Sequence, residues 1–210
     1  MPLDAAAIFH APRHALASLT PEWRRALAGL GLGWALLIGL FHADWAAMAG
    51  QWWNSSTYNH VLFVPPIVAW LVSLRAPALV RIAPSGWWPG LLALGGAALL
   101  WVLGTMAGLA TAAQAGVVSM AIATVLTMLG PRVAAGLAFP LAYMLFLVPV
   151  GDEFVPLLQM VTAHITIALV HLSGIPAQID GVFIDTPAGL FEVAEACSGV
   201  KFLIAMVALG

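Results

Sequence analysis

Charged residues are the scarcest feature of this chain, because Asp, Glu, Lys and Arg make up only 8% of its 210 residues. Cysteine is almost absent too, with Cys197 as its single representative. One cysteine excludes an internal disulfide framework, and no motif resembles a paired-cysteine zinc site. The seven Lys and Arg are dispersed and the net charge is -2, so the chain offers no basic surface for nucleic acid.

Apolar residues fill most of the remaining sequence. The chain is 62% hydrophobic with a mean hydropathy of +1.01, whereas a soluble domain is roughly 45 to 50% apolar. Several of the nine Trp residues lie close to the ends of the apolar runs, which is typical of interfacial anchoring in a bilayer. We therefore expect an all-α polytopic membrane protein whose main partner is the lipid bilayer.

The apolar runs predict about six to seven transmembrane or re-entrant helices after a cytoplasmic N-terminal leader over residues 1–25. The expected spans are 26–43, 61–74, 88–110, 115–129, 133–150 and 156–173, with a final helix starting at Val200. Cations lie before the first span, between the second and third, and between the fourth and fifth. The positive-inside rule therefore places those segments in the cytoplasm.

Four details refine these expected spans. The Pro65-Pro66 pair predicts a helix that restarts at Pro65 after an extended entry, which holds His60 near the outer face. Glycines at 95, 96 and 104 predict close helix packing. Small or polar residues at 111–114 predict a turn, and Pro140 predicts a kink in the fifth span.

Segment 156–173 is long enough to cross the bilayer, but it also carries a stripe of polar residues. The stripe is formed by Gln159, Thr162, Thr166 and Ser173 at helical spacing. Either the segment crosses, or it is a tilted or re-entrant helix whose stripe faces a cavity or the interface, which we favour. Period-two stretches over 177–196, around the turn residues 186–189, then predict a small extracytoplasmic β-hairpin.

Cys197 follows this hairpin, where a polar loop passes into the final apolar run. A helix start would favour its reactive thiolate, so it is a candidate nucleophile; a buried packing residue is the alternative. Three neighbours in sequence or space are open to two interpretations each. Glu195 either orders a basic partner or is a solvated loop charge. Lys201 either stabilises the thiolate or extends to the headgroups. His60 is a substrate contact, a proton carrier or a residue of the membrane interface.

The sequence around these residues resembles the exosortases, bacterial inner-membrane relatives of the archaeosortases, from about Tyr58 to Gly210. The motifs that carry the resemblance are Ala196-Cys197-Ser198-Gly199-Val200 after Phe191-Glu192-Val193, the stretch Leu147 to Asp152, and Tyr58-Asn59-His60 with Val64-Pro65-Pro66. The similarity is greatest to the A-type branch, which usually has Arg-Tyr where this chain has Lys201-Phe202.

This resemblance implies a membrane-embedded cysteine peptidase or transpeptidase with its active site on the extracytoplasmic side and no cofactor or metal. Cys197 matches the family nucleophile, and Ser198 and Gly199 belong to the same motif. The implied substrates are exported proteins with a C-terminal tail made of a Pro-Glu-Pro signature, a transmembrane helix and a basic cluster. Because the family also uses an Arg and a His on later helices, we expect residues 26–210 to be the N-terminal part of a single domain and the 210-residue form to be inactive alone.

Two other classes of protein compete with the enzyme. The first is a membrane scaffold or accessory subunit of an export or polysaccharide system, in which the hairpin docks a partner and Cys197 packs. The second is a small transporter, suggested by proline-broken helices and by His60, His164 and His171. Transporters usually carry paired charges at mid-membrane depth and an internal repeat, and the sequence shows neither.

Overall fold

The computed structural model describes residues 19–151, 154–200, 202 and 206, which are mostly helical and include a small three-stranded sheet. The chain divides into two compact units. The first comprises the residues up to Ala49 and Phe63–Val148, and the second comprises Gly50–Leu62 and the residues from Pro149 onward. Three helical segments are long and apolar enough to cross a membrane, or four if a bent pair counts as one span.

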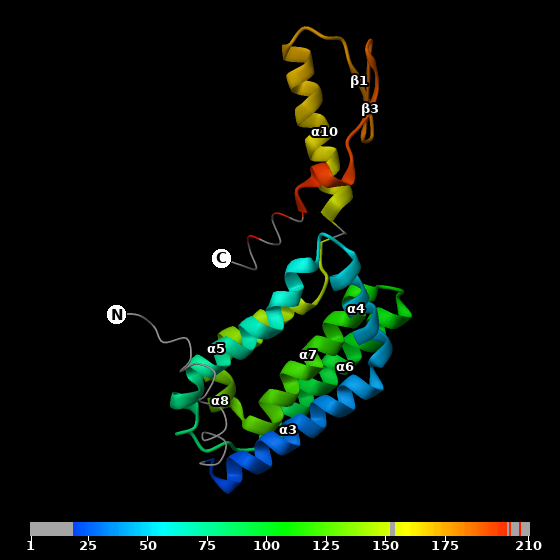
Figure 1. Ribbon diagram of the computed structural model, residues 1–210. Coiled ribbons are helices and arrows are strands. Elements are labelled where there is room, and N and C mark those ends of the chain that lie inside the picture. The colour runs from blue at the N-terminus through cyan, green and yellow to red at the C-terminus, as the bar shows by residue number, and fades with distance from the viewer. Residues whose placement is uncertain (1–18, 152–153, 201, 203–205, 207–210) are drawn as a thin grey trace, which may run out of the picture. The chain divides into compact units, whose positions relative to one another are not determined.

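Seven α-helices and two 3-10 helices are described before Pro149 (Figure 1). They are α3 (Pro21–Leu40), α4 (His42–Asn54), η1 (Asn59–Phe63), α5 (Val64–Leu79), α6 (Gly90–Met106), α7 (Ala110–Leu129), α8 (Pro131–Gly136), α9 (Ala138–Tyr143) and η2 (Met144–Leu147). In the first unit, α7 is the central helix, since α3 and α6 both pack along it and α8 follows it closely.

Glycines allow α6 and α7 to approach each other closely. A Cβ atom on Gly104 would lie 2.5 Å from the backbone nitrogen of Ala113, and one on Gly116 would lie 2.6 Å from that of Trp101. The prediction for Gly104 is therefore confirmed. It is wrong for Gly95 and Gly96, which are exposed and where a Cβ would meet nothing within 4 Å among the described residues.

Tryptophan hydrogen bonds tie α3 to its neighbours in the first unit. Trp23 Nε1 donates to the carbonyl oxygen of Ile82 at 3.1 Å, and Trp34 Nε1 donates to that of Ala121 at 3.0 Å. An apolar core lies at the Trp23 end of this helix. Its buried members are Trp23, Leu30, Leu79, Val125, Leu129, Val133 and Leu137.

The first expected span differs from the structure at both ends. Helix α3 begins at Pro21 rather than Ala26, because the Thr20 hydroxyl accepts a hydrogen bond from the Trp23 N–H at 3.4 Å and proline suits the first turn. After Phe41, a second helix, α4, follows at an angle of 83° to α3. We did not expect α4, although its alanine and methionine content favours a helix.

The second expected span is helical over a longer stretch than predicted. Helix α5 starts at Val64, beside the Pro65 expected to restart the helix, but its entry is the 3-10 helix η1 (Asn59–Phe63) and not an extended segment. Together they form a 21-residue candidate span. The helix also continues past Arg75 with Pro77 inside it, so the loop begins later than expected.

The fourth and fifth spans break at other positions than predicted. The chain turns at Gly108, with φ of 70°, so the polar residues 111–114 lie inside α7. The break in the fifth span falls at Leu137, between α8 and α9. Its cause is still Pro140, which has no N–H for the carbonyl of Gly136. Arg75 Nη1 donates to that carbonyl oxygen instead, at 3.5 Å.

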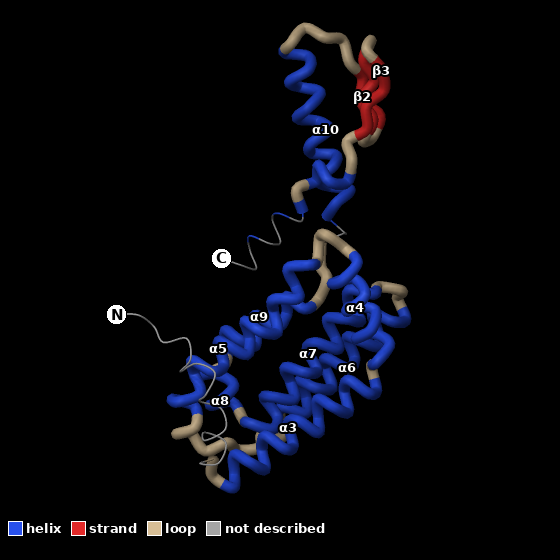
Figure 2. Tube along the Cα trace, viewed as in Figure 1, coloured by secondary structure: helices blue, strands red, loops and turns tan. Residues whose placement is uncertain are grey.

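The second unit combines a helix with an antiparallel sheet (Figure 2). Its described elements after Pro149 are α10 (Val155–Leu172), β1 (Gln178–Asp180), β2 (Phe183–Thr186), β3 (Gly189–Glu192) and the 3-10 helix η4 (Glu195–Ser198). The strand order is β1-β2-β3, so the expected hairpin has a third strand. The extra turn lies at Gly181, whose φ of 61° suits glycine.

A small core joins α10 to this sheet. It consists of Ala163 from the helix with Ile184 and Val193, all of which are buried. His171 Nε2 also donates to the carbonyl oxygen of Ala177 at 2.8 Å, where the chain leaves α10 for β1. Helix α10 matches the predicted segment 156–173 closely and is long and apolar enough to cross a membrane.

Candidate functional site

A cleft of about 450 Å³ lies within the second unit, between α10 and the β-sheet. It is lined by Thr162, Thr166, Val170, Ile175, Ile184, Thr186, Ala188, Phe191, Glu192, Val193 and Cys197. Most of these side chains are apolar, and the threonine hydroxyls, one carboxylate and the thiol are the polar groups. An apolar cleft with a few polar groups is typical of a ligand site.

The polar stripe of α10 holds the segment that carries the thiol. Gln159 Nε2 donates to the carbonyl oxygen of Val193 at 2.9 Å, and both residues are buried. One helical turn along, Thr162 Oγ1 donates to the carbonyl oxygen of Cys197 at 3.4 Å. Thr166 lines the cleft as well. The prediction that this stripe faces a cavity is confirmed for Thr162 and Thr166, whereas Gln159 is buried and does not line the cleft.

Cys197 is exposed and lies in η4, which precedes the final helix. Its own backbone N–H donates to the carbonyl oxygen of Ala194 at 2.9 Å. Gly199 then adopts a left-handed conformation, with φ of 69°, and helical structure resumes at Val200. Cys197 therefore precedes the final helix, and Gly199 separates the two helical segments.

Ser198 and Gly199 form the connection between the thiol and the final helix. The Ser198 hydroxyl oxygen accepts a hydrogen bond from the N–H of Val200 at 3.4 Å, as a residue that caps a helix does. The remaining charges predicted near the thiol are not located, since Lys201 and the side chain of Glu195 lie outside the described residues.

His60 lies in η1, at the start of the 21-residue candidate span. Its Nε2 atom is buried and has no hydrogen-bond partner among the residues described. The ring forms a hydrogen bond with the backbone of Thr57. Across the described parts of the chain, no hydrogen bond links His60 to Cys197, so the structure does not bring these two predicted site residues together.

The other two histidines considered in the sequence have local roles. His164 Nδ1 donates to the carbonyl oxygen of Met160 one turn earlier in α10, at 2.7 Å. His171 fastens the end of the same helix to the start of the sheet. Neither histidine lines the cleft that contains Cys197.

The family follows from comparison with known proteins. The sequence model of the transmembrane exosortases matches residues 52–210, which is most of the chain. The chain belongs to the transmembrane exosortase family. The matched region of this exosortase includes α10, the sheet, the cleft and Cys197. No curated protein and no solved structure matches the chain.

Sequence reasoning did not assign Gln159, Thr162 or Thr166 to the site of this exosortase. Their signal was the polar stripe at spacings of three and four along an apolar helix. The stripe indicates that the helix face meets something polar, but it does not say what. Gln159 bonds to the carbonyl of Val193, 34 residues away in sequence, and Thr162 bonds to that of Cys197, 35 residues away.

Proposed function

We propose that this exosortase is a membrane-embedded cysteine transpeptidase whose nucleophile is Cys197. The observation that carries the proposal is the exposed thiol in the wall of the cleft, within the region matched by the family. The proposed substrates are exported proteins with a C-terminal sorting tail of the Pro-Glu-Pro type. No cofactor takes part in this chemistry.

The reaction would proceed through a thioester. The thiolate of Cys197 attacks the carbonyl carbon of the scissile peptide bond, the C–N bond breaks, and the departing amine takes up a proton. An amine, a hydroxyl group or water then attacks the thioester and releases the thiol. The cleft supports this role because it lies between α10 and the sheet, where the hydroxyl oxygens of Thr162 and Thr166 can accept hydrogen bonds from the N–H groups of an extended peptide.

The residues around Cys197 have supporting roles in this proposal. Ser198 and Gly199 set the turn that holds the thiol away from the final helix. Glu195 binds the basic cluster of the substrate tail, Lys201 stabilises the thiolate, and His60 contacts substrate or carries a proton.

The proposed setting is the bacterial inner membrane, with residues 1–25 in the cytoplasm and residues 26–210 in a single domain. The full count of six to seven helices is reached if α6, the apolar segment Ala138–Leu147 and the helix from Val200 join the three or four candidate spans. The described arginines at 24, 25, 75, 81 and 132 support this orientation by the positive-inside rule. The proposed position of the active site is the extracytoplasmic side.

Processing of a tail-bearing reporter in cells that express the intact gene tests the proposal directly. We expect Cys197→Ala and Cys197→Ser to leave the reporter uncleaved while both variants accumulate in the membrane at the wild-type level. Ser173→Ala is the matched control, since Ser173 is exposed at the end of α10 and lies outside the cleft, and we expect it to process normally. Full processing by either Cys197 variant would refute the thiol mechanism.

A scaffold or accessory subunit is the second candidate, and one observation favours it. The side chains of Leu190 and Phe191 on the edge strand β3 are 67% and 55% exposed, which suits a docking surface for another protein. In that case both Cys197 variants would retain the function of the chain, whereas Leu190→Asp would abolish it. The same reporter assay therefore separates the two candidates.

A further inference from the structure

We propose that the first unit contains a binding site for one anionic phospholipid of the surrounding bilayer. An acyl chain would fill an apolar cavity between α3, α5, α7 and the α8–α9–η2 segment, and nearby arginines would bind the phosphate. This site is separate from the cleft that holds Cys197, and the inference does not depend on the proposed peptidase function.

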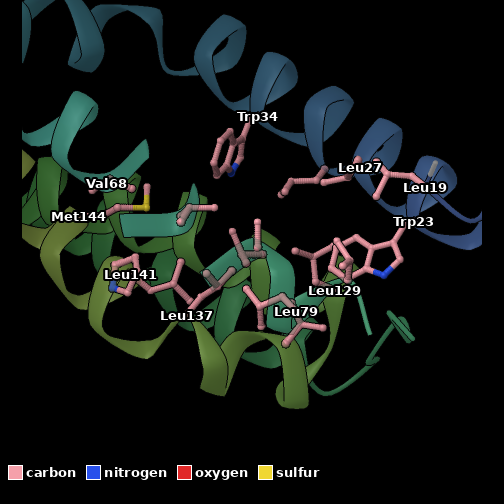
Figure 3. Close-up of a pocket in the computed structure, with 17 residues that line it drawn as sticks. Leu19, Trp23, Leu27, Trp34, Val68, Leu79, Leu129, Leu137, Leu141 and Met144 are labelled. Carbon is pink, nitrogen blue, oxygen red and sulfur yellow. The ribbon is translucent and has the colours of Figure 1, made fainter. Parts of the chain in front are cut away.

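The cavity has a volume of about 320 Å³, at the lower end of the range of roughly 300 to 1,000 Å³ typical of ligand pockets. Figure 3 shows Leu27 and Trp34 of α3 on one side and Val68, Leu137 and Met144 on the other. All the side chains that line it are apolar or aromatic. A hydrocarbon chain therefore matches the wall.

The two indole groups in the wall offer no hydrogen bond to a ligand. Trp23 Nε1 donates to Ile82 and Trp34 Nε1 donates to Ala121, so both N–H groups are already satisfied. A polar molecule inside the cavity would lose its hydrogen bonds to water without replacement, which is unfavourable. This excludes a sugar, a nucleotide or a polar peptide as the occupant.

The shape of the cavity also suits an acyl chain. Its lining residues follow one face of α3 from Trp23 to Trp34, a distance of about 16 Å at the helical rise of 1.5 Å per residue. Half of the hydrocarbon core of a bilayer is about 15 Å thick. A chain of one leaflet would therefore be covered over most of its length.

Three arginines are next in sequence to residues that line this cavity. Arg24 follows Trp23, Arg81 follows Val80, and Arg132 precedes Val133. All three arginine side chains are exposed. The hydrogen bond between Trp23 and Ile82 keeps the start of α3 beside the loop that carries Arg81. Three separate segments of the chain therefore each carry an arginine next to the wall of the cavity.

Arginines outnumber acidic residues in the described part of the first unit. Its acidic residues there are Glu22 and Asp44, against five arginines, and Asp44 accepts a hydrogen bond from Trp101 Nε1 at 3.0 Å. Arginine binds phosphate oxygens with two parallel hydrogen bonds, and basic pockets between membrane helices bind anionic headgroups. The charge complementarity selects an anionic phospholipid over a zwitterionic one.

Native mass spectrometry of the purified chain in detergent tests the site. The probes are phosphatidylglycerol and phosphatidylcholine with the same dioleoyl chains. We expect phosphatidylglycerol to bind at one site about tenfold more tightly, and to raise the melting temperature more than phosphatidylcholine does. Arg81→Gln combined with Arg132→Gln should remove this preference.

Two variants that introduce the same side chain distinguish binding in the cavity from general contact with lipid. Ala76→Phe places an aromatic ring in the cavity and should abolish tight binding of phosphatidylglycerol. Ala93→Phe places the same ring in a different, mostly apolar hollow, none of whose lining residues is next in sequence to an arginine, and should leave binding unchanged. Val72→Phe is a second filling variant if Ala76→Phe does not fold.

Two results would overturn the proposal. Equal affinity of the wild-type chain for the two lipids would show an unselective lipid-facing groove. Undiminished phosphatidylglycerol binding by a folded Ala76→Phe or Val72→Phe chain would show that the acyl chain lies elsewhere.

Discussion

Gly199 decides how the backbone passes from Cys197 to the final helix. Its φ of 69° is left-handed, and a Cβ atom there would meet nothing within 4 Å, so only the backbone conformation demands glycine. We predict that Gly199→Ala destabilises this turn by about 1 to 2 kcal/mol, whereas Gly199→Asn is tolerated because asparagine adopts this conformation more readily. Thermal unfolding and the alkylation rate of Cys197 measure the effect. Identical behaviour of the two variants would contradict it.

Gln159 of α10 also helps to hold the segment that leads to Cys197. Its amide is the described hydrogen-bond donor to the buried carbonyl of Val193, so Gln159→Ala would leave that oxygen unsatisfied, at a cost of about 1 to 3 kcal/mol. We predict a lower melting temperature and faster alkylation of Cys197, since the segment leading to it loses its contact with α10.

Gln178→Ala is the matched control for this substitution. Gln178 is exposed on β1, so we expect the melting temperature and the alkylation rate of its variant to stay at wild-type values. A Gln159→Ala chain that is as stable as the Gln178→Ala chain would show that the buried hydrogen bond contributes nothing measurable.

Among the elements, the α6–α7 pair depends on the absence of side chains. Gly116→Ala would push a methyl group against the backbone of Trp101, and we predict a loss of stability of about 1 to 3 kcal/mol from overpacking. Gly95→Ala on α6 is the control, because a Cβ there meets open space and alanine favours helix. Urea or thermal unfolding in detergent compares them. Equal stability of the two variants would contradict close packing.

The helices also show how far hydropathy locates elements. Apolar runs identified every long helix of the described chain except α4, but their ends were displaced wherever polar or proline residues lay inside a helix. Gln114 illustrates the reason, since it is 3% exposed within α7 although its sequence neighbourhood predicted a turn. Tertiary packing buries such residues inside a helix, and a short window of sequence does not reveal this.

At the scale of the whole molecule, orientation in the membrane is the property to test. Cys197 is the single cysteine and is exposed, so a membrane-impermeant maleimide should label it in intact spheroplasts. The control is Ala83→Cys in a Cys197→Ala background, because Ala83 is exposed in the loop that follows Arg81. We predict that this control is labelled only after lysis. The opposite pattern would reverse the proposed orientation.

The amino-acid sequence alone identified a membrane protein, most of its helices, the exosortase family and the thiol of Cys197. These features follow from composition, hydropathy and a short motif, which depend on neighbouring residues. Tertiary structure was needed for the cleft, for the third strand of the sheet and for the turn that separates Cys197 from the final helix. The hydrogen bonds of Gln159 and Thr162 join residues that are more than thirty positions apart in sequence. Only packing of α10 against the sheet brings such distant groups together.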